Sequence, residues 1–395
     1  MTFSGEVYLD NSATTPVFPQ VISIMNKVMQ DEYGNPSSLH RRGTGAARIM
    51  EAARRTIAEL LCVSNEEIFF TSGGTESNNL AIMGIARRNK RRGNHLVTTL
   101  IEHSSVLESF QQLEEEGFRV SYLLPDKDGI IEPSSVADTV CDQTILVSVM
   151  HVNNEIGTVQ PVSQIAKAVK ARNPNVAFHV DGVQSFAKLL LHPHDNRIDA
   201  LSISAHKFHG PRGMGALYLR RGVLVDPLLR GGGHEKGFRA GTENTPGIAG
   251  MALAARLSCR DQQQKMKHLN SLKESIIAAI TRGHPWVKVN GAEKERGAPH
   301  ILNLSFPGLK GELILHALEE YNVYVSTGSA CHSHKNNPSH VLQALKLDER
   351  SMEGAIRISL SEQNTGEQID YAVEALNKVI ASLSDKNKRS EVRNQ

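Results

Sequence analysis

The sequence predicts an α/β fold: a mostly parallel, seven-stranded sheet between helices, with a smaller α+β domain beside it. Short runs rich in β-branched and aromatic residues alternate with longer helical patterns over residues 67–220. Such alternation is typical of a parallel sheet that helices cover on both faces. The length of 395 residues suggests two or three domains, because a domain averages about 150 residues.

Seven strands are expected in the alternating region. They cover residues 67–72, 95–101, 119–124, 144–152, 176–181, 200–205 and 215–220. Helical patterns at 76–92, 104–117 and 161–172 separate several of them. Strands joined through helices in this way pair in parallel, which is why most of the sheet is predicted to be parallel.

The second half of the chain predicts a bridge and a second domain. A continuous helical pattern from about 248 to 282 is the best candidate for the bridge. The pattern after it alternates strands and helices, and the polar tail at 384–395 is expected to be frayed. We expect a large domain at 15–255 and a small domain formed by 1–14 and 256–395.

Composition excludes several classes of protein. The 44 basic and 42 acidic residues leave a net charge of +2, which argues against a nucleic-acid partner. The N-terminus has no signal-peptide pattern, and no apolar run approaches the roughly 20 residues that span a bilayer. We therefore expect no membrane association and a cytoplasmic location.

The four cysteines are scattered at 62, 141, 259 and 331 without a C-x-x-C pair, so neither a metal site nor a dithiol is expected. Such sparse cysteines fit a reducing compartment. Cys62 and Cys141 lie in apolar patterns and Cys259 lies on the long helical stretch, which predicts packing roles. Cys331 lies in a segment rich in Gly, Ser, Ala and Asn, which predicts a mobile loop.

Three segments contain candidate cofactor-binding residues. TSGGTESNN (71–79) joins a strand to a helix, so Gly74 and Thr75 could form a phosphate cradle at the helix N-terminus. The alternative is an ordinary capped turn. Asp181 ends an apolar strand, where α/β sheets place ligands, and its alternative role is a helix N-cap.

The third segment places Lys207 directly after a strand, with Ser204 and His206 beside it. A lysine is usually solvated, but one held among ligand-binding groups suits Schiff-base chemistry. A lysine for the aldehyde, an acid for the pyridinium nitrogen and a helix terminus for the phosphate are what pyridoxal 5′-phosphate requires. Together the three segments predict that cofactor.

Long motifs along the chain resemble the cysteine desulfurases of the NifS/IscS type, which belong to the class V aminotransferase-like, fold-type I pyridoxal phosphate enzymes. The matching motifs are YLDNSATTP (8–16), GNPSSLH (34–40), TSGGTESNNLAI (71–82), EHSSVL (102–107), HVNNEIGTVQP (151–161), HVDGVQ (179–184), SAHKFHGPRGMGALYLR (204–220), GGGHEKGFRAGTENTP (231–246) and STGSACHSHKNNPSHVLQAL (326–345). The resemblance covers nearly the whole chain except the tail.

The resemblance implies a role for each matching residue. Lys207 would bond to the cofactor, His103 would stack on its ring and move protons, and Cys331 would accept sulfur from the substrate. The cofactor-binding residues would be Gly74, Thr75, Asp181, Gln184, Ser204, His206, Lys207 and, from the partner subunit of a homodimer, Thr242. The substrate-binding residues would be Asn11, Asn154 and Arg357.

The activity implied is the conversion of L-cysteine to L-alanine, with sulfur transfer to Cys331 as a persulfide. An acceptor protein would then receive the sulfur for iron–sulfur cluster or other thio-cofactor assembly. One alternative is a selenocysteine lyase, which shares most motifs. A class V transaminase or lyase without a persulfide role is a second, and a non-catalytic sulfur-trafficking adaptor is a third.

The chain departs from the family pattern at a few positions. His332 and His334 follow Cys331, where small residues are usual, and we expect them to be solvated or to tune the thiolate rather than bind a metal. His234 and Ser361 replace a usual glutamine and glycine without removing a reactive group. The tail lacks the aromatic and acidic ending by which housekeeping members engage an iron–sulfur scaffold, so the acceptor stays open.

Overall fold

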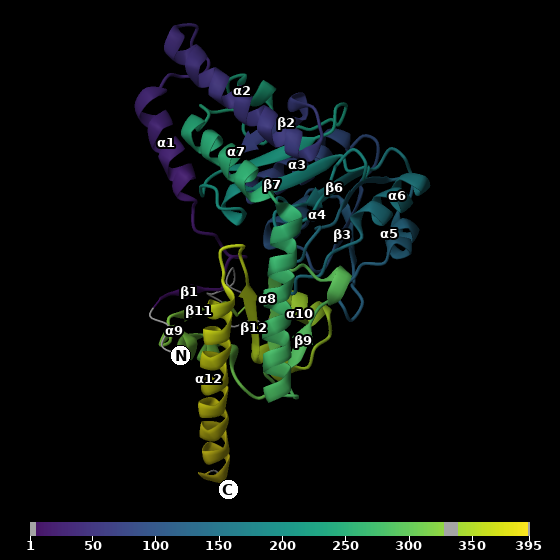
Figure 1. The fold of residues 1–395 in the computed structure, drawn as a ribbon. Helices are drawn as coiled ribbons and strands as arrows, with labels where there is room; N and C mark the ends of the chain where they lie inside the picture. The colour runs from purple at the N-terminus through teal and green to yellow at the C-terminus, as the bar shows by residue number, and fades with distance from the viewer. Residues whose placement is uncertain (1–4, 328–338, 394–395) are drawn as a thin grey trace.

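The central sheet has seven strands in the order β2-β8-β7-β6-β5-β3-β4. In the computed structural model, which describes residues 5–327 and 339–393, these strands are β2 (Ile68–Thr71), β3 (His95–Thr99), β4 (Arg119–Leu123), β5 (Thr144–Ser148), β6 (Ala177–Asp181), β7 (Ala200–Ser204) and β8 (Gly215–Leu219). Neighbours from β7 to β4 pair in parallel, whereas β8 is antiparallel to both β7 and β2. The predicted seven-stranded, mostly parallel sheet is confirmed (Figure 1).

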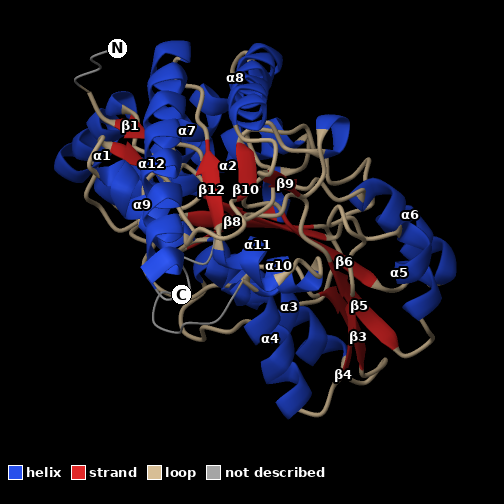
Figure 2. Ribbon diagram, turned by 90° about the horizontal axis from the view of Figure 1, so that it is seen from below, coloured by secondary structure: helices blue, strands red, loops and turns tan. Residues whose placement is uncertain are grey.

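Helices cover both faces of this sheet, as the alternating pattern predicted. Figure 2 shows α3 (Gly74–Asn89) and α4 (Ser104–Glu115) on one side of the parallel strands, and α5 (Pro133–Thr139) and α6 (Val162–Arg172) on the other. Consecutive residues of one strand enter different cores: Leu96 packs with α3 and α4, whereas Val97 packs with α5 and α6. Successive side chains of a strand point to opposite faces of the sheet, so a strand covered on both faces needs apolar residues at odd and at even positions.

The helices α1 (Pro19–Asp31), α2 (Arg41–Leu61) and α7 (Thr245–Cys259) pack on one another at one end of the sheet (Figure 1). Their apolar side chains join the core that also contains α5 and α6. The short helices α10 (His340–Ala344) and α11 (Glu349–Glu353) lie far along the chain, yet Val341 and Leu342 enter this same core.

A second core forms around a small antiparallel sheet of order β12-β10-β9. Its elements are α8 (Gln262–Gly283), β9 (Lys288–Asn290), β10 (Ile301–Ser305), α9 (Gly311–Glu319), β12 (Ala355–Ser359) and α12 (Gly366–Arg393). The N-terminal strand β1 (Val7–Tyr8) joins this core by pairing with β11 (Val323–Tyr324) in parallel. The domain boundaries at 15 and 255 stay a prediction.

Two predicted helix limits are wrong. The helix expected at 248–282 is divided into α7 and α8, because Asp261 has a left-handed backbone with φ of 53°. The Nζ of Lys265 donates to the carbonyls of Leu257 and Ser258 at 2.8 and 3.1 Å, which satisfies the exposed end of α7. The last helix is longer than expected: α12 continues to Arg393, and no Gly or Pro interrupts it after its first residue.

No helix of the described residues is long and apolar enough to cross a membrane.

A buried ion pair fastens the glycine-rich loop at 231–241 to the central sheet. The guanidinium of Arg54, on α2, donates from two nitrogens to both carboxylate oxygens of Glu235 at 2.8 Å. The same carboxylate accepts the backbone N–H of Phe70 in β2 at 2.9 Å. Both side chains are almost fully buried, so each charge depends on the other for compensation.

We predict that Glu235→Ala lowers the free energy of unfolding by about 3–5 kcal/mol, because it leaves the Arg54 guanidinium buried without its buried counter-charge. Denaturant titration measures this change. The control is Glu51→Ala, which removes a more exposed carboxylate from the same arginine, 3.2 Å away, and should cost about 0.5 kcal/mol or less. Equal losses in the two variants would contradict the prediction.

Candidate active site

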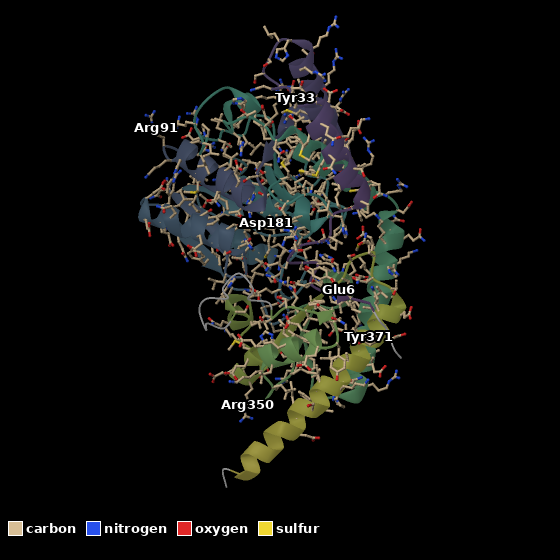
Figure 3. The ribbon with its side chains drawn as sticks, turned by 90° about the vertical axis from the view of Figure 1, so that its left-hand side faces the viewer. Glu6, Tyr33, Arg91, Asp181, Arg350 and Tyr371 are labelled. Atoms are coloured by element: carbon tan, nitrogen blue, oxygen red, sulfur yellow. The ribbon has the colours of Figure 1, made fainter. Side chains whose placement is uncertain are left out.

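The candidate site lies at the C-terminal ends of parallel strands. Asp181 is the last residue of β6, Ser204 is the last residue of β7, and Lys207 ends the short 3-10 helix that follows β7. Because β6 and β7 are parallel, their ends meet at one edge of the sheet. Figure 3 shows Asp181 near the middle of the molecule, in contrast to Tyr33 and Arg350 at its periphery.

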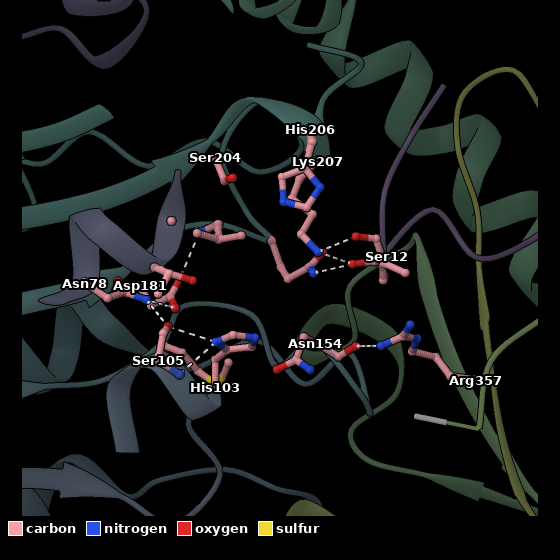
Figure 4. A pocket seen from close by; sticks show the side chains of 16 residues that line it. Ser12, Asn78, His103, Ser105, Asn154, Asp181, Ser204, His206, Lys207 and Arg357 are labelled. Carbon is pink, nitrogen blue, oxygen red and sulfur yellow. Dashed lines mark hydrogen bonds between the residues drawn. The ribbon is translucent and has the colours of Figure 1, made fainter. Parts of the chain in front are cut away.

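A cavity of about 350 Å³ opens at this edge (Figure 4). Most of the predicted site residues line it: Gly74, Thr75, His103, Asn154, Asp181, Gln184, Ser204, His206, Lys207 and Arg357. They come from segments that are far apart in the sequence, so the fold is what brings them together.

Hydrogen bonds hold the Asp181 carboxylate in place from two sides. One oxygen accepts the backbone N–H of Val183 at 2.9 Å, and the other accepts the Asn78 side-chain amide at 2.8 Å. The same Asn78 amide donates to the Ser105 hydroxyl at 2.9 Å, and that hydroxyl lies 2.8 Å from Nδ1 of His103. A continuous polar network therefore connects Asp181 to His103 (Figure 4).

The side chain of His103 also begins α4. Its Nδ1 accepts the backbone N–H of Ser105 at 3.1 Å, as an N-cap does. An Nδ1 that accepts a hydrogen bond leaves the ring proton of a neutral imidazole on Nε2, the nitrogen not engaged by this cap.

The amine of Lys207 is held by main-chain carbonyls from the N-terminal segment. Its Nζ donates to the carbonyls of Ser12 and Ala13, the latter at 2.9 Å. Beside it, burial and then the charges of Lys207 and Arg212 lower the pKa of His206 to about 3. His206 is therefore neutral at physiological pH, and it adds no positive charge next to the lysine.

The N-terminus of α3 faces the cavity without a side-chain cap. Gly73 occupies the N-cap position, and no side chain of the described residues caps the first turn there. Free N–H groups at a helix start bind anions, and Thr75, Ser204 and His206 add polar groups around them. A Cβ on Gly74 would lie 2.7 Å from Cγ2 of Val183, so the close approach requires glycine.

Arg357 approaches the cavity from β12 of the second core. Its side chain is 4% exposed, and it donates to the Asp10 carboxylate at 2.8 Å and to the Asn154 carbonyl at 3.0 Å. Its Nε is buried and has no hydrogen-bond partner in the described structure. A buried cationic nitrogen of this kind suits an anionic ligand group.

Two predicted site residues lie outside the cavity lining, and a third falls outside the described residues. The Asn11 amide donates to the carbonyls of Tyr8 and Ser359 at 3.2 and 3.0 Å and does not line the cavity, so its substrate-binding role stays a prediction. Thr242 is exposed, in the loop before α7, and also lies outside the cavity lining. Cys331 falls outside the described residues, as do His332 and His334.

The other cysteines differ from one another. The packing prediction is wrong for Cys62, which is exposed and ends α2 in a left-handed conformation. Cys259 is partly buried, and burial raises its pKa to about 11. Burial also raises the pKa of Cys141, but a hydrogen bond from Thr144 and further donors outweigh it and leave that pKa below the usual value. Among the described residues, no three His, Cys, Asp or Glu side chains gather as metal ligands.

Sequence reasoning missed six residues that line the cavity: Ser12, Ala13, Asn78, Ser105, Met150 and Val183. A signal existed for one of them. Asn78 follows Gly74 by four residues on the same helix, so both face the same side. Ser12 and Ala13 contribute main-chain carbonyls, which no residue-type pattern reveals.

The profile of the aminotransferase class-V family matches residues 7–372. The chain belongs to this family. Among its relatives, a cysteine desulfurase IscS of Clostridium botulinum strain Hall is 43% identical over 376 residues, which cover 95% of this chain and 94% of the relative. Within the class-V family the chain therefore belongs with the cysteine desulfurases of the NifS/IscS type.

Solved structures with similar sequences have the same fold. A NifS-like protein superposes with a TM-score of 0.91 at 38% identity, covering 96% of this chain and all of the other. SspA in complex with cysteine superposes with a TM-score of 0.79 at 36% identity, covering 91% of this chain and all of SspA. The predicted fold-type I architecture is confirmed.

The cofactor of these class-V enzymes is pyridoxal phosphate, and the residues of the cavity fit it. Buried oxygens of Asn78 and Gln184 have no hydrogen-bond partner in the described structure, which is expected of groups that contact a ligand. Asp181 provides a carboxylate for the pyridinium nitrogen, the α3 N-terminus provides donors for the phosphate, and Lys207 provides the amine.

We predict that Gly74→Ala weakens pyridoxal phosphate binding by about tenfold, roughly 1.4 kcal/mol, because the new methyl group meets the stiff side chain of Val183. The dissociation constant, measured by fluorescence titration, reports the change. The double variant Gly74→Ala with Val183→Ala should recover most of the affinity, since it removes the colliding atom. A double variant as weak as Gly74→Ala would refute the steric explanation.

Proposed function

We propose that this chain is a pyridoxal-phosphate-dependent cysteine desulfurase that converts L-cysteine to L-alanine and transfers the sulfur to Cys331 as a persulfide. The observation that supports it best is the convergence of Lys207, Asp181 and Arg357 on one cavity. Chemistry on a free amino acid with this cofactor needs an amine that the amino group of the substrate can replace, an acid that polarises the cofactor ring, and a cation that binds the substrate carboxylate. Lys207, Asp181 and Arg357 provide these three groups in that order.

When bound, pyridoxal phosphate supplies an electron sink that weakens bonds at the α-carbon of the amino acid. Asp181 supports this sink, because its carboxylate is fixed by Val183 and Asn78 where a ring nitrogen can keep its proton. Lys207 holds and moves a proton at Nζ, which the Ser12 and Ala13 carbonyls orient. His103 presents Nε2 for a second proton transfer, since Nδ1 is engaged by Ser105.

Arg357 and Asn154 bind the substrate. The buried Nε of Arg357, which has no hydrogen-bond partner among the described residues, would donate to the α-carboxylate of cysteine, while Asp10 and the Asn154 carbonyl hold the guanidinium in place. The Asn154 side chain lines the cavity next to it. Lys207 lines the same cavity, so a substrate held here shares the cavity with the reactive amine.

The role proposed for Cys331 in sulfur transfer rests only on the sequence motif at 326–345 in which it lies. The Cys331 thiolate attacks the sulfur of the substrate, an S–S bond forms, and the C–S bond breaks, so that the carbon retains the electron pair and takes up a proton to become alanine. The thiolate is the reactive form, so this thiol must remain reduced and unpaired between turnovers, which supports a cytoplasmic location.

The enzyme is proposed to act as a homodimer that delivers sulfur to an acceptor protein for iron–sulfur cluster or other thio-cofactor assembly. Support for the dimer comes from Thr242, which is exposed and outside its own cavity, as a residue that contacts a partner subunit would be. Large apolar side chains on α1 and in the loop before α2 are also exposed: Ile22, Met29, Tyr33 and Leu39. Exposed apolar side chains grouped in this way are typical of interaction surfaces.

We predict that the wild-type enzyme releases equimolar alanine and sulfide from cysteine in the presence of a thiol reductant. Lys207→Ala should lose at least about a thousandfold in kcat, roughly 4 kcal/mol of transition-state stabilisation, and should lose the absorbance band of the bound cofactor. Cys331→Ser should keep that band and lose sulfide release.

Two outcomes would point to the other candidates. Sulfide release at the wild-type rate by Cys331→Ser would leave a transaminase or lyase without a persulfide step. Turnover of selenocysteine but not of cysteine would indicate a selenocysteine lyase.

We predict that the enzyme sediments at twice the mass of one chain, and that Leu39→Asp shifts it toward the monomer and weakens pyridoxal phosphate binding. A charge at this side chain, which is 98% exposed, is costly only if a partner covers it. The control is Leu190→Asp, at a leucine in a different loop that is 69% exposed. A monomeric wild type with full cofactor affinity would rule out the dimer.

A further inference from the structure

A buried glutamate next to the site has no role in the steps above. Glu102 directly precedes His103, and its side chain is completely buried. One oxygen, Oε1, accepts the Thr99 hydroxyl at 2.8 Å and the Met150 backbone N–H at 2.9 Å. The other oxygen, Oε2, is buried without a hydrogen-bond partner in the described structure.

These contacts join the ends of two neighbouring strands. Thr99 is the last residue of β3, and Met150 lies just beyond β5 and lines the cavity. The next residue along, His151, donates its backbone N–H to the Asp181 carbonyl at 2.9 Å. Glu102 is therefore next to His103 in the sequence, and the main chain of Met150 and His151 links its side chain to the Asp181 carbonyl.

The surroundings of Glu102 favour an uncharged carboxyl group. Asp181 is a second carboxylate close enough to disfavour a negative charge on Glu102. The neighbouring imidazoles provide no cation: burial lowers the pKa of His151 to about 4, and burial also lowers that of His340, whose Nε2 donates to the Glu102 carbonyl at 2.9 Å. Both donors on Oε1 are neutral groups, and no described lysine or arginine pairs with it.

We propose that Glu102 is a positioning residue that works as a neutral carboxylic acid, holding the ends of β3 and β5 together next to His103 and Asp181. Its carbonyl oxygen accepts two hydrogen bonds and its hydroxyl group is the remaining donor. Burial raises the pKa of this carboxyl to about 8, in agreement with a proton that stays bound at neutral pH. Asp181 is then the one carboxylate of the pair available to a pyridinium.

A neutral acid and an amide have nearly the same shape and hydrogen-bonding groups, so Glu102→Gln is the decisive variant. The pKa of Glu102 is higher in the folded state than in the unfolded state, so the bound proton stabilises the fold. This stabilisation is complete below about pH 4.5, and it is lost progressively as the pH rises toward 8. The amide does not titrate. We expect the melting temperature of Glu102→Gln, relative to wild type, to rise by roughly 5 °C between pH 5 and pH 8.

Affinity for pyridoxal phosphate is the second measurement. Glu102→Gln should bind within about twofold of wild type at pH 7, whereas Glu102→Ala, which lacks both the acceptor and the donor, should bind at least about tenfold more weakly. This arm rests on the proposed function. A wild type that binds no pyridoxal phosphate would defeat that function, but the melting comparison would still decide the role of Glu102.

The matched control is Glu67→Gln, at a buried glutamate outside the cavity. Burial raises the pKa of Glu67, but the Arg221 backbone N–H at 2.8 Å and His194 at 3.0 Å outweigh it and hold the pKa below the usual value. This carboxylate is charged, so its amide variant should melt lower than wild type at pH 7 and leave cofactor affinity unchanged. The proposal is overturned if Glu102→Gln melts lower than wild type at pH 8, fails to fold, or loses affinity as Glu102→Ala does.

Discussion

The site depends on one constraint: a carboxylate must stay in place at the end of a buried strand, facing the cavity, although no lysine or arginine of the described residues is paired with it. Asp181 meets it through two hydrogen bonds, one from the backbone of Val183 and one from the amide of Asn78. Both donors are neutral, so the negative charge remains available to a cationic ring nitrogen. The β6 and β7 edge, the start of α3 and the cap of α4 all take their positions around this carboxylate.

The two cores contribute different halves of the chemistry. The large sheet provides the carboxylate, the anion-binding helix terminus and the lysine, which are the groups that a phosphate-bearing cofactor requires. The smaller core provides Arg357 on β12, together with the segment after β1 that contains Ser12 and Ala13. Buried polar atoms without a partner among the described residues occur on both sides of the cavity, including the Gln184 amide oxygen and Arg357 Nε. The cavity therefore combines groups from both cores that fit a cofactor and, as proposed, a substrate carboxylate.

Sequence patterns predicted the sheet and most of the cavity because these depend on strong local signals. Alternating strands and helices place strand ends at one edge, so a polar residue that ends an apolar strand, such as Asp181, is a candidate for a ligand site. Sequence patterns did not predict the features that depend on main-chain geometry. The break at Asp261 depends on a backbone angle, and the lysine contacts at Ser12 and Ala13 involve carbonyls that every residue possesses. The exposed position of Cys62 depends on where α2 ends, which its apolar neighbours do not indicate.

The pairing of β1 with β11 has a consequence for synthesis on the ribosome. Strands β2 to β8 and the helices between them are complete by residue 219, so the large sheet can begin to form while the rest of the chain is still being made. Val7 can pair only after Val323 has been synthesised. Likewise, the backbone N–H of Ser12 can donate to the hydroxyl of Ser359 only after Ser359 has been synthesised. The nascent protein thus contains its reactive lysine long before the carbonyls that restrain it are in place, and newly made chains can acquire a closed pocket only when translation is almost finished.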